Sequence, residues 1–190
     1  MPMVMGCTNT KEVSSPPPPL SEPQPPQKQV DPRLPFTNYR QVFMMKNSWK
    51  AVLRASDDTA KGSLLGFFKN NPEFRAMFTK FQKFHNLYNE DEIYEDTVFE
   101  AHALAIFGVF NQVLENLENV DLAIEVLHKT GKQHAAMEGF EAKYFQCMVS
   151  SFMTACRQTL GDRFTPNVEK NFEELFVFIH KHLTEGFNSG

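Results

Sequence analysis

The chain has 190 residues, of which 42% are hydrophobic and 22% are charged, and its formal net charge is −4 with neutral histidines. This length predicts one domain with a sizeable core and room for an appended tail. A mildly acidic chain of this kind is not expected to bind nucleic acid, which needs a basic patch. The 19 phenylalanines, against one Trp and four Tyr, favour packed helices around a flat apolar group.

Proline placement predicts where the domain begins. Ten of the twelve prolines lie at or before Pro35, so residues 1–35 are predicted to be a disordered proline-rich tail and residues 36–190 a domain. Within the tail, Gly6 and Cys7 match an N-myristoylation motif with a palmitoylatable cysteine beside the glycine. This motif needs glycine at the amino terminus. It therefore predicts lipidation, and with it membrane association, only if translation starts at Met5; otherwise the match is chance.

Cellular location is predicted from what the sequence lacks. Three cysteines do not make a disulfide framework, and reduced thiols are typical of a cytoplasmic protein. No apolar run approaches the 18 or more residues of a membrane span, and no basic stretch followed by an apolar one marks a secretory signal. We therefore expect a cytoplasmic protein.

Helical periodicity dominates the chain after Pro35, and no alternating strand pattern is present. Residues 81–96 are polar and acidic and predict a connection rather than a helix. The body is therefore predicted to be all-α, with about seven helices. In chain order, helices are expected over residues 38–55, from 56 to about 70, from 72 to 77 or 78, and over 97–117, 120–134, 141–160 and 166–187.

Two of the six histidines differ from the rest because they lie on apolar helix faces. His102 lies in an apolar stripe between Phe99 and Ile106, and His134 ends the next helix on the side that carries Thr130. Two uncharged imidazoles that converge in a dry pocket suit the axial positions of a haem iron. Zinc-ligand spacings, phosphate-binding glycine loops and nucleophile elbows are absent from the sequence. Candidates for apolar walls around such a group are Phe78, Phe81, Phe140 and Phe145.

From about residue 40 to 187, the chain resembles the globin family, most nearly its cytoglobin and neuroglobin branch and the intracellular globins of invertebrates. The resemblance is carried by an ordered set of motifs, and the 32-residue separation of His102 and His134 fits it. The motifs are Trp49 after Asn47-Ser48, Asn71-Pro72-Glu73 followed by Phe78 and Phe81, Ala101-His102 with the residues up to Leu117, and Gly131-Lys132-Gln133-His134 followed by Lys143-Tyr144-Phe145.

The resemblance implies a three-over-three helical sandwich of seven to eight helices that holds haem b. It implies that His134 is the proximal iron ligand through Nε2, with the other nitrogen donating to an acceptor such as the Thr130 carbonyl. His102 becomes the distal residue and a candidate sixth ligand. His128, which lies about 120° around the helix from His134, is rejected as the proximal ligand and is assigned with His180 and His182 to surface or helix-end positions. The remaining implied haem contacts are Leu64, Phe78, Ile106, Phe140, Phe145, Met148 and Ile179.

The function that the resemblance implies is oxygen binding or transport, with O₂, NO or CO at the haem iron. The sequence leaves open whether His102 ligates the iron. An open iron site favours reversible gas binding, whereas a hexacoordinate, bis-histidyl site favours a redox or sensing role with an unidentified reductase or electron-transfer partner. No enzyme is predicted, and any nitrite reductase or NO dioxygenase activity would be minor. The alternative from another class is a haem-free globin-like interaction module.

Overall fold

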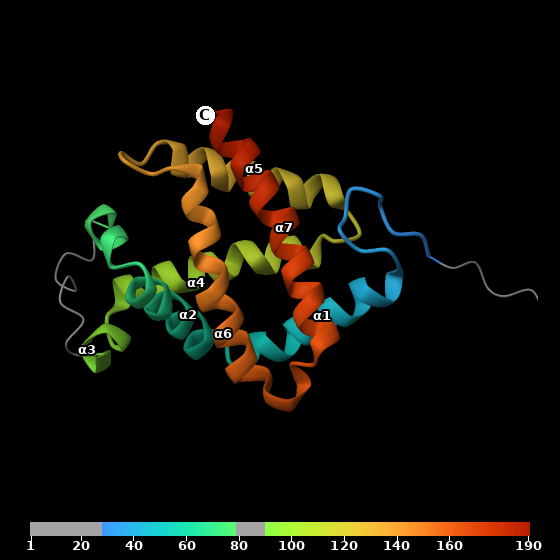
Figure 1. Cartoon of the computed structure of the whole chain (residues 1–190), viewed down its shortest axis with the longest axis horizontal. Coiled ribbons are helices and arrows are strands. Elements are labelled where there is room, and N and C mark those ends of the chain that lie inside the picture. Colours follow the sequence, from blue (N-terminus) through green and yellow to red (C-terminus); the bar gives the residue numbers. More distant parts are fainter. Residues whose placement is uncertain (1–27, 79–89) are drawn as a thin grey trace, which may run out of the picture.

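The structure is a computed structural model that describes residues 28–78 and 90–190, and within these ranges it contains helices and no strands (Figure 1). The all-α prediction is therefore confirmed. Three of the elements are 3₁₀ helices, named η. In chain order the elements are α1 (Tyr39–Leu53), α2 (Ser56–Asn70), η1 (Pro72–Met77), α3 (Glu90–Tyr94), α4 (Thr97–Glu115), α5 (Val120–Ala135), η3 (Ala142–Cys147), α6 (Met148–Leu160), η4 (Gly161–Arg163) and α7 (Pro166–Asn188).

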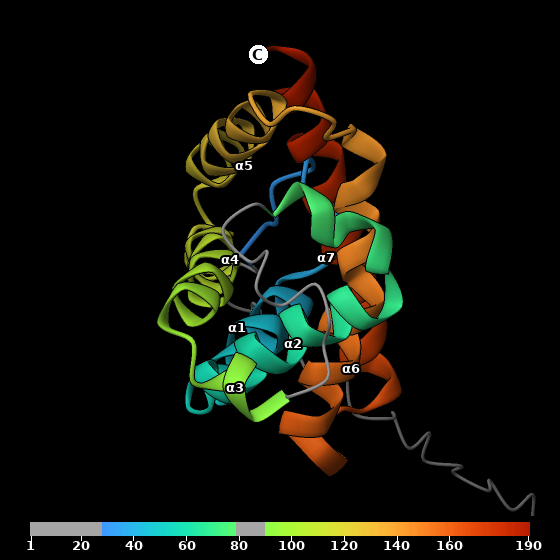
Figure 2. The same cartoon turned by 90° about the vertical axis from the view of Figure 1, so that its left-hand side faces the viewer.

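The helices pack in two layers. Figure 2 shows α4 and α5 on one side of the molecule and α6 and α7 on the other. Helix α5 packs along α7, α2 packs against both α4 and α6, and α1 contacts α4, α6 and α7. This is the helical sandwich that the sequence predicts, and it leaves α4 and α5 facing the other layer across the interior.

Polar residues at the helix ends fix where the long helices begin. Asp96 caps α4, because its Oδ1 accepts hydrogen bonds from the backbone N–H of Val98 and Phe99 at 3.0 and 2.8 Å. Thr165 caps α7 in the same way, and Pro166 opens that helix where its missing N–H is not needed. These caps set the register of α4 and α7, and with it the residues that each helix turns to the interior.

An aromatic cluster joins the two layers in the core. The indole of Trp49 on α1 stacks on Phe152 of α6, with ring centroids 6.1 Å apart. Its Nε1–H donates to Oδ1 of Asn111 on α4 at 3.0 Å, so the polar edge of this buried side chain is satisfied. Phe110 of α4 stacks on the same Phe152 at 4.2 Å. The abundance of phenylalanine is thus explained partly by ring packing between helices.

Helix α4 is 19 residues long, and its most apolar 18-residue window has a mean hydropathy of 1.3, so by length and composition it could cross a membrane. Its apolar side is buried in the core, however, with Phe99, Ala103 and Phe107 each at most 3% exposed. It packs against α2 and α5. Its hydropathy is therefore accounted for by its central place in the fold.

The prediction that residues up to 35 form a disordered tail is wrong for residues 28–35. Leu34 and Phe36 are buried in the core at 6% and 5% exposure. Arg33 Nη1 forms an ion pair with Asp121 at the start of α5, at 2.6 Å. Two apolar anchors and this ion pair hold the segment against the body, despite its prolines, and the folded unit begins before residue 36. Gly6 and Cys7 lie outside the described residues.

Two local expectations also need correction. The acidic connection contains a short helix, α3, whose first turn carries Glu90, Asp91 and Glu92, which are favourable at a helix N-terminus. Its Ile93 is buried in the core at 1% exposure. The helix expected from residue 141 begins instead with the 3₁₀ turn η3 before α6. The rest of the connection, residues 79–89 with Phe81, lies outside the described part of the chain.

Candidate functional site

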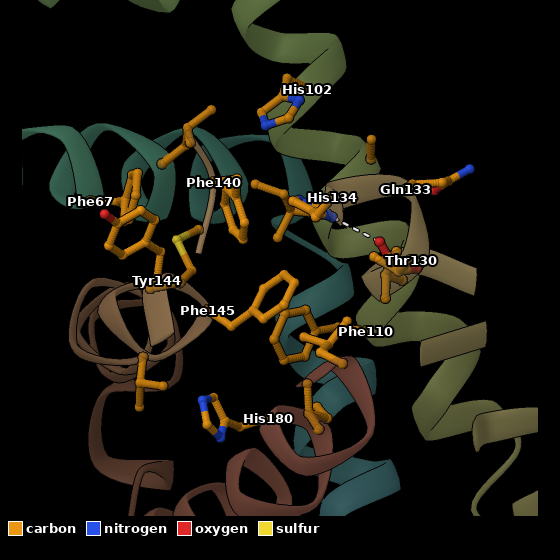
Figure 3. Close-up of a pocket in the computed structure, with 18 of the residues that line it drawn as sticks. Phe67, His102, Phe110, Thr130, Gln133, His134, Phe140, Tyr144, Phe145 and His180 are labelled. Atoms are coloured by element: carbon orange, nitrogen blue, oxygen red, sulfur yellow. Dashed lines mark hydrogen bonds between the residues drawn. The ribbon is translucent and has the colours of Figure 1, made fainter. Parts of the chain in front are cut away.

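A cavity of about 290 Å³ lies between the two layers. It is lined by side chains from α2, α4, α5, α6 and α7 and from the segments around η1 and η3 (Figure 3). Apart from Phe81, which lies outside the described residues, the structure brings the predicted pocket residues to this one cavity. They are Leu64, Phe78, His102, Ile106, His134, Phe140, Phe145, Met148 and Ile179.

His134 lies in the last turn of α5 with its imidazole in the cavity wall. Its Nδ1 is 2.8 Å from the backbone carbonyl oxygen of Thr130, one helical turn earlier (Figure 3). Because a carbonyl oxygen only accepts, Nδ1 must carry the proton and donate it. The expected hydrogen bond to Thr130 is confirmed, and it leaves Nε2 with an unprotonated lone pair, the form that binds metals.

Two phenylalanines hold the His134 ring in place. The ring centroid of Phe140 lies 4.9 Å from that of the imidazole, and the centroid of Phe145 lies 5.1 Å away with the rings nearly perpendicular. Both come from the segment that follows α5, where the chain turns back toward α6. The imidazole is therefore fixed by a hydrogen bond at one edge and by aromatic contacts around it.

His102 reaches the same cavity from α4. Phe99 and Ala103 point into the core of the layer, so the register of the helix places His102 and Ile106 at the cavity instead. The ring of Phe78 meets the His102 imidazole edge-on, with centroids 5.4 Å apart. Figure 3 shows His102 and His134 projecting from different helices toward the same space.

The remaining polar side chains of the wall are mostly engaged with other partners. The Thr130 hydroxyl donates to the Val126 carbonyl at 2.8 Å, and the Tyr144 hydroxyl donates to Oε1 of Glu141 at 2.6 Å. Leu64, at 1% exposure, contributes only methyl groups. Most of the lining is aliphatic or aromatic, so the cavity suits a flat apolar ligand whose polar contacts come from the imidazoles.

Several lining residues were missed by the sequence reasoning, and one of them is chemically notable. His180 on α7, predicted at the surface or a helix end, lines the cavity and is half-buried. Its Nε2 is buried and has no hydrogen-bond partner among the described residues. The periodicity of α7 carries the signal, because Phe176, His180 and Leu183 lie at helical spacing and all line the cavity. The other missed residues are Phe67, Ala105, Val109, Phe110, Thr130, Gln133, Tyr144, Val149, Phe176 and Leu183.

The structure contradicts the surface position predicted for His182 and agrees with the rejection of His128 as the proximal ligand. His182 was expected at the surface or a helix end but is buried at 6% exposure. Its place on α7 could have been predicted, since Leu175, Ile179, His182 and Gly186 follow each other at helical spacing and are all buried. His128 is half-exposed and does not contribute to the cavity wall, so its rejection in favour of His134 is consistent with the structure.

Family comparison agrees with this geometry. The Globin family model matches residues 62–183, about two thirds of the chain and the part that contains most of the cavity wall. The chain belongs to the globin family. Cytoglobin-2 of Danio rerio is 26% identical over 144 residues, which cover 76% of this chain and 79% of that protein. Cytoglobin-2 of Oryzias latipes is 24% identical over 147 residues, which cover 77% and 80%.

A solved structure resembles this globin over most of its length. It is the crystal structure, at pH 4, of a hexacoordinated haem protein from an anhydrobiotic tardigrade. The two chains are 31% identical with a TM-score of 0.77, and the match covers 83% of this globin and 99% of the tardigrade protein. The resemblance predicted from the ordered sequence motifs is confirmed.

Proposed function

We propose that this globin binds haem b in the cavity and binds a diatomic gas such as O₂, NO or CO at the haem iron. The observation that carries the proposal is the hydrogen bond from His134 Nδ1 to the Thr130 carbonyl, which directs a basic Nε2 to the cavity that His102 also faces. When bound, haem supplies the iron that takes up gas reversibly and exchanges single electrons.

The residues present fit this group. His134 would hold the iron through Nε2, and Phe78, Phe145 and Met148 would lie against the porphyrin, whose apolar body matches the aliphatic and aromatic wall. The Thr130 carbonyl keeps the proton on Nδ1, which makes Nε2 the stronger donor. Exclusion of water by these walls protects the iron from unwanted oxidation chemistry.

His102 would occupy the iron's sixth position when no gas is bound, so we propose a hexacoordinate resting state. The structurally similar tardigrade protein is described as hexacoordinated, which supports this assignment. His102 would then compete with the gas, so the apparent affinity for gas would be reduced according to the fraction of molecules with an open site. Leu64 carries no hydroxyl, so His102 would also be the distal donor to a bound gas.

A bis-histidyl site favours a redox or sensing role over simple transport. Two neutral imidazoles ligate both oxidation states of iron, which suits exchange of one electron with a reductase or other electron-transfer partner. We propose that this chain works in the cytoplasm in such a role. The haem-free interaction module remains as the outcome to be expected if the reconstituted protein takes up no haem.

The proximal assignment is tested by His134→Ala. Loss of the ligand should reduce the haem that co-purifies, or is retained after reconstitution and gel filtration, to a small fraction of the parent value. His128→Ala, on the same helix but outside the cavity wall, is the matched control and should retain haem fully. Equal haem retention by both variants would overturn the assignment of His134.

The distal assignment is tested by His102→Leu with visible absorption spectra of the dithionite-reduced protein. The parent should show the sharp, split bands of a six-coordinate iron with two imidazoles. The variant should show the single broad band of a five-coordinate iron and bind CO faster, because no internal ligand must leave first. If the reduced parent already shows the single broad band, and the His102→Leu spectrum is the same, His102 is not a ligand of the iron.

A further inference from the structure

A second cluster of potential metal ligands lies outside the cavity, where α5 crosses α7. His128 on α5 and His182 and Glu185 on α7 each offer a donor atom, and these three atoms lie within 4.8 Å of one another. Nε2 of His128 is 3.3 Å from Oε2 of Glu185, and Nδ1 of His182 is 2.7 Å from the same oxygen. None of the three contributes to the cavity wall described above.

Close contact between the two helices fixes this arrangement. A Cβ on Gly186 would lie 2.5 Å from the Cα of His128 and 2.3 Å from its carbonyl oxygen, so only glycine allows the backbones to approach this far. Gly186 directly follows Glu185, and His182 lies one turn earlier on the same helix. Backbone packing therefore fixes how closely the two helices that carry the donors approach each other.

We propose that His128, His182 and Glu185 form a site for a divalent transition-metal ion of the zinc type. Two imidazoles and one carboxylate are a ligand set that Zn²⁺ adopts, with a water in the fourth position. In a tetrahedral site with bonds of about 2.0–2.1 Å, neighbouring ligand atoms lie about 3.3 Å apart. The His128–Glu185 separation of 3.3 Å already has this value, and the His182–Glu185 separation of 2.7 Å is somewhat shorter. The two imidazole nitrogens, which lie within 4.8 Å of each other, would move together when they bind the ion.

Burial and exposure also suit a bound ion. The side chain of His182 is 8% exposed, whereas those of His128 and Glu185 are 43% and 45% exposed, so an ion could enter from solvent and keep a water ligand.

The nitrogen-rich donor set selects the kind of ion. Mg²⁺ and Ca²⁺ prefer six or more oxygen ligands, which this cluster cannot supply. Imidazole with carboxylate suits Zn²⁺, and by the general order of affinities Cu²⁺ would also bind. A bound ion would connect α5, which carries His134 six residues after His128, to α7.

The test is a Zn²⁺ titration of haem-loaded protein by competition with a chromophoric chelator. The parent should bind one Zn²⁺ at this site. His128→Ala and Glu185→Gln should each weaken that binding by at least about tenfold, since even the loss of an outer-shell partner costs about that much. Glu173→Gln, which removes an exposed carboxylate from the same helix, is the matched control and should bind like the parent.

A second measurement separates the site from adventitious zinc elsewhere. The bound ion should raise the melting temperature of the parent and of Glu173→Gln but not of His128→Ala. Only folded protein with an intact site binds the ion, and this binding stabilises the folded state. Zn²⁺ binding and thermal stabilisation that are equal in all variants would overturn the proposal. If the protein does not bind haem, His102 and His134 become available to zinc. Repeating the titration in a His134→Ala background then separates zinc bound in the haem cavity from zinc bound at the His128, His182 and Glu185 site.

Discussion

His134 takes its chemical form from a backbone carbonyl one helical turn away. The Thr130 oxygen, 2.8 Å from Nδ1, fixes both the tautomer and the plane of the ring, and the neighbouring Phe145 ring restricts its rotation. This explains how a half-exposed helix end presents a well-defined donor to the cavity.

The thiol of Cys156 should be inert in the folded protein. It is completely buried on α6, and burial raises its pKa to about 12. At pH 8 only about one molecule in ten thousand then carries the reactive thiolate. Brief iodoacetamide treatment followed by peptide mass spectrometry should therefore find Cys156 unlabelled until denaturant is added. The half-buried Cys147 is the internal comparison and should label first; rapid labelling of native Cys156 would contradict its burial.

The crossing of α5 and α7 depends on two glycines that allow close backbone contact. A Cβ on Gly131 would lie 2.1 Å from the Leu183 carbonyl oxygen and 2.7 Å from the Phe187 nitrogen, both backbone atoms of α7. Gly186 makes the reciprocal approach to His128. In the sequence, Gly131 is notable only as the first residue of the motif that ends at His134. Its role in packing cannot be predicted without knowing which helix lies opposite.

Gly131→Ala should destabilise the protein and disturb the site. Overpacking of a tight contact typically costs about 1–3 kcal/mol, and here the neighbouring atoms are backbone atoms that cannot rotate away. The displaced helix also carries His134, so haem retention should fall as well. Gly108→Ala is the matched control, because nothing lies within 4 Å of a Cβ there and alanine is the better helix former by about 0.5–1 kcal/mol. A melting temperature of Gly131→Ala that equals or exceeds that of Gly108→Ala would refute the close-contact argument.

Helix periodicity in the sequence predicts the long helices better than it predicts the connections between them. The apolar stripe around Phe99, His102 and Ile106 is visible in the sequence because one helix face is buried along its whole length. The short helix α3 has no such stripe, and Ile93 is the residue of this helix that is buried, so its composition resembles that of a loop. The predicted cavity residues that the structure describes lie at the cavity, but His180 and His182 were misassigned. Their burial depends on α5 and the other elements that cover α7, which no local pattern shows.

The N-terminal segment matters to the whole molecule because it contacts elements far away in the chain. Leu34 and Phe36 enter the core, and Arg33 pairs with Asp121 at the start of α5. The segment thus covers an edge of the helical sandwich close to the helix that carries His134. Composition alone assigns this segment to a flexible tail, because a few apolar residues among prolines do not look sufficient to order the chain.

Truncation at two positions tests this boundary. A chain that begins at Thr37 loses Leu34 and Phe36, whose burial stabilises the fold by about 1.5–3 kcal/mol each as an upper estimate. Its melting temperature should fall by roughly 6–24 °C, given about 2–4 °C per kcal/mol for a domain of this size. A chain that begins at Lys28 keeps every described contact and should melt like the full chain. Leu34→Ala in the full chain should reproduce part of the loss. Equal melting of both truncated chains would restore the boundary at residue 36 that proline content predicts.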